Sequence, residues 1–157
     1  MITEEREYAT YSSMPSVSYK IIEHLMTNPK AEIIWKLLKY NDADAYTRPN
    51  LTQKEKAALI YKGEAIQADY RVFFDFMMDD AETEMNTILR IYPAEVYPIN
   101  RVTGLCTINF EVFTHSKINH LSNYTTRVDV IIQTLIDVLN GADIGEIGRA
   151  SCRERVL

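Results

Sequence analysis

The spacing of apolar residues changes twice along this 157-residue chain, and these changes restrict the fold more than any other feature. Apolar residues recur every three to four positions in runs from residue 17 to about residue 62, every second position in three runs between residues 70 and 114, and every three to four positions again over residues 125–140. These periods are typical of helices, strands and a final helix, in that order. The order predicts an α+β domain with helices on one side of a small sheet.

The helical regions carry their own boundary signals. The spacing predicts a helix over residues 17–28, after which Asn28 and Pro29 form the cap and first turn of a second helix, since proline loses no helical hydrogen bond there. Thr52 and Glu55 have the spacing of a capping box, which opens a third helix. A broad apolar stripe predicts a C-terminal amphipathic helix, over residues 125–140, packed on the sheet.

Three strands are predicted, over residues 70–78, 87–92 and 105–114. The connections between them are short and contain no crossover helix, so we expect a three-stranded, mainly antiparallel sheet. Pro93 and Pro98 lack the amide hydrogens of a ladder, so the segment that follows the second strand is predicted to be a loop.

The two ends of the chain lack apolar periodicity. Residues 1–16 are predicted to be a flexible arm, residues 17–144 a single α+β domain, and residues 145–157 a disordered tail. The tail contains GRASCRERV, which resembles a translated cloning or sequencing-adapter scar, so we interpret it as non-native. Its last ten residues contain three arginines and one glutamate; without them the net charge changes from -5 to -7.

The charge balance excludes one large class of function. Acidic residues outnumber lysine and arginine 22 to 17, which argues against a protein that grips nucleic-acid phosphates. The two cysteines, Cys106 and Cys152, are too few for a disulfide framework and lack the spacing of a zinc site. No apolar stretch approaches membrane-spanning length, and the glutamate-rich start is unlike a signal peptide, so we expect neither export by that route nor a membrane anchor.

One acidic cluster is the best candidate for metal chemistry. Carboxylate oxygens can hold Mg²⁺ or Ca²⁺. The run contains no glycine, which an EF-hand requires, and the next predicted strand has no acid to complete a two-metal site, so we interpret it as a solvated hairpin tip. Its members are Asp75, Asp79, Asp80, Glu82 and Glu84.

Other reactive side chains have no recognisable catalytic setting. His115 and His120 lie five positions apart, with no further ligand at a metal-binding spacing. Cys106 has the inward phase of its strand, which predicts a small buried apolar residue rather than a nucleophile. Phosphate-binding glycine motifs and the G-x-S-x-G motif are absent from the sequence. We therefore expect no catalytic residue, no cofactor and no metal, and a protein that is not an enzyme.

Tyrosines are numerous in positions that core packing does not demand. Aromatic residues in arms, loops and element ends are either loop anchors or contacts with partners. Their number favours a protein of an assembly. They are Tyr8, Tyr11, Tyr46, Tyr92, Tyr97 and Tyr124.

The stretch from Tyr97 to Gly141 reads YPINRVTGLCTINFEVFTHSKINHLSNYTTRVDVIIQTLIDVLNG. It resembles the C-terminal half of small neck proteins of tailed bacteriophages, of the head-tail connector and tail-terminator type. In these proteins a strand that ends near a histidine-bearing turn leads to an arginine-containing helix ending in Leu-Asn-Gly. The stretch covers less than a third of the chain.

The resemblance implies a structural virion protein, made in the host cytoplasm, that forms a homo-oligomeric ring in the neck. Its partners would be copies of itself and portal, adaptor or tail-tube proteins, with DNA only as passing cargo. Candidate subunit-interface residues are Tyr92, Tyr97, Arg101 and Arg127, the arginines through salt bridges to neighbours. Two alternatives stay open: a small intracellular adaptor or regulatory protein-binding module, and a metal-dependent hydrolase built on the acidic cluster.

Overall fold

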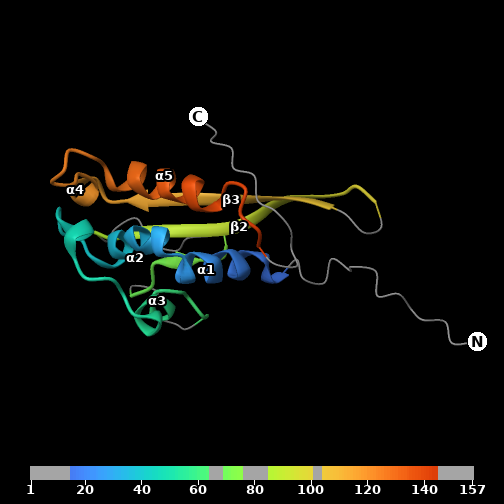
Figure 1. Ribbon diagram of the computed structural model, residues 1–157, viewed down its shortest axis with the longest axis horizontal. Coiled ribbons are helices and arrows are strands. Elements are labelled where there is room, and N and C mark those ends of the chain that lie inside the picture. Colours follow the sequence, from blue (N-terminus) through green and yellow to red (C-terminus); the bar gives the residue numbers. More distant parts are fainter. Residues whose placement is uncertain (1–14, 64–68, 76–84, 101–103, 145–157) are drawn as a thin grey trace, which may run out of the picture.

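The computed structural model describes residues 15–63, 69–75, 85–100 and 104–144 (Figure 1). These residues form five α-helices and one three-stranded sheet, which confirms the α+β class. Most of the predicted arm and all of the predicted tail lie outside the described residues.

The first N-terminal helix has nearly its predicted limits, and the next two begin where their cap signals predict; the third ends at Ala58, before Gly63. They are α1 (Val17–Thr27), α2 (Glu32–Lys39) and α3 (Gln53–Ala58). Asn28 caps the short 3-10 turn that leads into α2, because its side-chain oxygen accepts from the Lys30 amide at 2.9 Å. The capping box of α3 is confirmed: the Thr52 hydroxyl accepts from the Glu55 amide at 3.3 Å, and the Glu55 carboxylate accepts from the Thr52 amide at 2.7 Å.

The sheet is mixed, in the order β1-β2-β3. Its strands are β1 (Val72–Phe73), β2 (Thr87–Pro98) and β3 (Gly104–Thr114). The β2–β3 pair is antiparallel, and β3 coincides with the predicted third strand. The first pair departs from the predicted antiparallel arrangement, because Val72 aligns in parallel with Leu89. Residues 74–86 connect the two strands, which is just long enough for the dozen or so residues that a parallel crossover needs.

The prediction of a loop after residue 92 is wrong, because β2 continues through both prolines. Pro93 faces Ile108 and Pro98 faces Gly104, with one irregularity between Pro93 and Glu95. β1 ends at Phe73, so this half of β2 has a neighbour on one side only. Proline is tolerated on such a free edge, where no amide donor is needed.

The direction of the amides explains how both prolines fit. The Leu89 amide donates to the Arg71 carbonyl at 2.8 Å, on the β1 side, and therefore points away from β3. Amides alternate in direction along a strand, so Pro93 points away from β3 as well. An unbulged strand would turn Pro98, five residues later, toward β3. The extra residue at position 94 restores the phase, so neither proline removes a bond from the β2–β3 ladder.

The core forms where the helices meet one face of the sheet. Contacts join α2 to α5 (Arg127–Leu139), α5 to β3, and both α1 and α2 to β2. Leu89 and Ile91 are the fully buried residues that β2 contributes to this cluster. Trp35 of α2 lies fully inside it and donates its indole N–H to the Leu25 carbonyl at 3.1 Å.

The far half of the β2–β3 pair extends beyond the helices as a two-stranded projection (Figure 1). We call Tyr92–Pro98 together with Gly104–Asn109 the ribbon. From Pro93 to Pro98 every β2 residue is exposed, whereas Thr87–Ile91 at the other end of the strand is buried. The strand therefore has one half in the core and one half outside it.

Candidate interaction surface

The ribbon carries apolar side chains that the core does not cover. Tyr97 is 55% exposed, Leu105 58% and Val96 42%, and Ile99 beyond the end of β2 is 68% exposed. Soluble chains seldom leave apolar side chains grouped on one projection unless a partner covers them. The ribbon is therefore the first candidate for a contact surface.

The apolar side chains lie on both faces of the ribbon. Tyr97 faces Leu105 across the two strands, and Val96 faces Cys106. Since successive residues of a strand point to opposite faces, these two pairs lie on opposite sides. A partner that covers only one face leaves the other apolar pair exposed, so both faces of the ribbon are suited to contacts.

Tyr97, one of the predicted interface residues, is a neutral exposed phenol. Its hydrogen bond to the Glu95 carboxylate raises the pKa of the phenol above its ordinary value, because the nearby negative charge disfavours loss of the proton. An exposed tyrosine offers apolar area and one polar group, a combination that is common at protein interfaces.

Tyr92, another predicted interface residue, belongs to a polar cluster at the base of the ribbon. Its hydroxyl donates to Glu111 Oε1 at 2.6 Å, and Arg90 Nη1 lies 3.2 Å from Glu111 Oε2. The Arg90 guanidinium also lies 5.9 Å from the ring centre of Tyr92 and 5.7 Å from that of Phe113. Tyr92 is thus half-buried and partnered within its own chain, and it braces the ribbon.

Arg127 is not on the surface, where salt bridges to a neighbour were expected. Its side chain is fully buried and donates to four backbone carbonyls. Nη1 donates to Leu37 at 2.7 Å and Tyr40 at 2.8 Å, Nη2 to Asp42 at 3.0 Å, and Nε to Ile118 at 3.1 Å. Burial lowers the pKa of the guanidinium from its ordinary value. Arg127 therefore joins parts of its own chain.

The fourth predicted interface residue, Arg101, lies outside the described residues.

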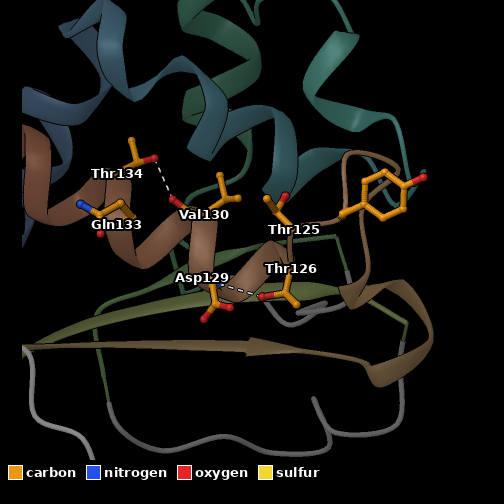
Figure 2. Close-up of a pocket in the computed structure, with 7 residues that line it drawn as sticks. Thr125, Thr126, Asp129, Val130, Gln133 and Thr134 are labelled. Carbon is orange, nitrogen blue, oxygen red and sulfur yellow. Dashed lines mark hydrogen bonds between the residues drawn. The ribbon is translucent and has the colours of Figure 1, made fainter.

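Another exposed aromatic residue follows α4 (Ser116–Asn119), a helix at the end of the molecule away from the ribbon (Figure 1). Tyr124 is fully exposed and has a φ of 67°, a left-handed conformation that costs energy in a bulky residue. It borders a shallow depression along the first turns of α5 (Figure 2). Thr126 caps that helix by accepting from the Asp129 amide at 3.3 Å.

The candidate metal ligands do not converge in the described part of the chain. Asp75 is exposed, and the other four acids of its cluster lie outside the described residues. His115 caps α4 through Nδ1, which accepts from the Lys117 amide at 3.2 Å, and His120 is exposed. Over residues 15–63, 69–75, 85–100 and 104–144, no group of three histidine, cysteine or acidic side chains is placed to hold a metal ion.

Cys106 is half-buried rather than fully buried as expected. Burial raises the pKa of its thiol, which keeps the thiol protonated and poorly nucleophilic near neutral pH.

None of the helices formed by the described residues combines the length and the apolar character that a membrane span requires.

Comparison with known proteins gives one family. The model of the YomW family, a phage-named family, matches residues 31–156, which is most of the chain. The matched range runs through most of the C-terminal tail, so it lends no separate support to a foreign origin for that segment. No curated protein and no solved structure matches the chain significantly.

Proposed function

The chain belongs to the YomW family, and from this premise we propose that it is a structural protein of a phage virion. In this proposal it forms an oligomeric ring in the neck, between portal and tail, through which DNA passes. Its partners are copies of itself and the portal, adaptor or tail-tube proteins on either side. It performs no catalysis and needs no cofactor.

The exposed apolar side chains of the ribbon are the observation that supports the proposal. A ring subunit presents two different patches, one to each neighbour, and the contact repeats until the ring closes. A projection that leaves the core and exposes Tyr97, Leu105 and Ile99 is suited to reach a neighbouring subunit. The apolar area that it exposes gives such a contact its driving force.

The charge of the chain is consistent with DNA as cargo rather than as ligand. The net charge is -5. A channel that holds duplex DNA weakly needs few cationic contacts, because each neutralised phosphate adds affinity. In the part of the chain that the structure describes, the buried arginines are Arg90 and Arg127, and both are committed to groups of their own chain.

Electron microscopy of the purified protein and mass spectrometry of purified virions test the proposal. We expect rings in the first experiment and peptides of this chain in the second. A double variant, Tyr97→Ser with Leu105→Ser, should keep the circular dichroism spectrum and lose the rings. Thr107→Ser, an exposed substitution on the same ribbon, is the matched control and should keep them. A wild-type protein that is monomeric and absent from virions would contradict the proposal.

The second candidate is an adaptor or regulatory module that binds another protein. The exposed and conformationally strained Tyr124 favours it, since strain in an exposed aromatic residue is often retained for a contact. In that case Tyr124→Gly should weaken binding of the partner while relieving the strain. Absence from virions, together with a stable complex with one host or phage protein, would select this candidate.

A further inference from the structure

The outer edge of β3 pairs with no other strand in residues 15–63, 69–75, 85–100 and 104–144. Among the described residues, backbone hydrogen bonds join β3 to β2 and to no other segment. Leu89 of β2 faces Val112 of β3, and the Leu89 amide points away from β3, toward β1. In an antiparallel pair, two residues that face each other either both point their amides toward the partner strand or both point them away. The Val112 amide therefore points away from β2, to the outer edge of the sheet. β3 contains no irregularity of register, so the amides of Ile108 and Cys106 point outward too.

This edge lacks the features by which proteins usually prevent strand pairing. Edge strands are normally short, or carry lysine, proline or a bulge. β3 is eleven residues long and contains neither proline nor lysine. Its one charged residue, Glu111, is held in an ion pair with Arg90. A second copy of the same strand would therefore meet no free like charge at that position.

The other edges of the sheet are closed to pairing. Residues 59–61 cover β1: the amides of Arg71 and Val72 donate to the Leu59 carbonyl at 2.8 and 3.0 Å, and the Tyr61 amide donates to the Val72 carbonyl at 2.9 Å. The free half of β2 carries a bulge, and its prolines occupy two positions that would otherwise donate outward.

We propose that β3 pairs with β3 of a second copy of this chain, in antiparallel orientation around a two-fold axis. The described sheet offers one pairing edge, and an antiparallel edge is complementary to itself, so two copies use the same surface. The contact joins two three-stranded sheets into one and closes after two copies. It differs in symmetry from the ring proposed above and does not rest on it.

Proline substitutions on the two edges of the ribbon test this pairing. Cys106 and Val96 face each other, and both amides point outward, on opposite edges. Cys106→Pro removes one outward donor from β3 of each copy and should weaken the dimer at least about tenfold. Val96→Pro makes the same kind of change on the β2 edge and should leave the dimer intact. Sedimentation over a range of concentrations measures both.

Hydrogen exchange of the wild-type protein provides a second test that needs no variant. The Ile108 and Phe110 amides should exchange faster on dilution, because they are protected only in the dimer. The Asn109 amide points toward β2 and should show no such dependence. Concentration-independent exchange at Ile108 and Phe110, or equal weakening by Cys106→Pro and Val96→Pro, would overturn the pairing. A dimer that persists in Cys106→Pro would overturn the pairing and leave the ring of the proposed function untouched, because the two contacts differ in symmetry.

Discussion

Arg127 shows how much one buried residue contributes here. Its guanidinium joins the end of α2, the following turn and α4 to the start of α5 by donating to four carbonyls. The carbonyls of Leu37 and Tyr40 belong to the end of a helix, where the negative end of the helix dipole favours a cation. A buried charge is tolerated only when hydrogen bonds replace the water that it loses.

Replacement of Arg127 by methionine should therefore destabilise the fold strongly. The change keeps much of the side-chain volume and leaves four carbonyls without their donor, so we expect a loss of at least about 3 kcal/mol in the free energy of unfolding. Urea denaturation measures it. Arg48→Met, which removes an exposed ion pair with Asp42, is the control and should cost at most about 1 kcal/mol. Similar losses for the two variants would contradict this role.

Glu55 makes the stability depend on acid pH. Hydrogen bonds from the Thr52 amide, Lys39 and the Thr52 hydroxyl lower the pKa of its carboxyl from 4.5 to about 2. A lowered pKa in the folded state means that these contacts stabilise the fold above pH 4.5, and that their contribution is lost as the pH falls through about 2.

Glu55→Gln should thus lower the melting temperature at pH 6, and the difference from the wild type should shrink as the pH approaches 2. Thermal melts across this range provide the measurement. The exposed substitution Glu23→Gln is the control for a general effect of charge. A difference between wild type and Glu55→Gln that is the same at pH 6 and pH 2 would exclude the capping carboxylate as the cause.

At the scale of elements, β2 depends on the direction of its amides. The extra residue of the bulge turns Pro93 and Pro98 to the same edge, away from β3. Without the bulge, one of the two prolines would take the place of an amide that donates to β3. By the same alternation, the Glu95 amide points toward Thr107 of β3. Adjacent positions therefore differ sharply in their tolerance of proline.

Glu95→Pro should open the ribbon, whereas Val96→Pro should not. The first change removes a ladder donor, with a cost of at least about 1 kcal/mol, and the second removes a donor that points to solvent. Exchange of the Leu105 and Thr107 amides should accelerate in the first variant alone. Glu95→Ala controls for loss of the carboxylate. Equal exchange in both proline variants would contradict the assigned directions.

The caps and strands of this chain could be predicted to different degrees. The Asn28 cap, the capping box of Thr52 and Glu55, and β3 were predicted correctly because each depends on neighbours in sequence. The parallel β1–β2 pair was not, since its register depends on how residues 74–86 return to the sheet. The Pro93–Pro98 half of the ribbon was predicted as a loop, because residue spacing does not show which edge of a strand is free and so tolerates proline.

At the scale of the molecule, the exposed end of the ribbon is separate from the core. The buried cluster is built from α1, α2, β1, the first half of β2 and α5, and the exposed end of the ribbon contributes nothing to it. The core should therefore fold without the end of the ribbon.

A variant in which Asn-Gly replaces residues 96–106 tests this separation. The two new residues link Glu95 to Thr107, which face each other, in a turn suited to a hairpin. We expect the helical circular dichroism to be kept and the urea midpoint to stay close to that of the wild type, because none of the described residues that the variant lacks is buried. Rings should be lost, because the exposed Tyr97 and Leu105 are removed. A protein that no longer folds would place the ribbon within the folding unit.

The sequence by itself determined the order of helices and strands, the caps and the apolar face of each element, because neighbouring residues decide these through local hydrogen bonds and periodicity. The tertiary structure decided that Arg127 is internal, that β1 runs parallel to β2, and that one half of the β2–β3 pair projects from the core. These depend on which distant carbonyls, strand edges and apolar surfaces are brought together, and residue spacing carries no information about that.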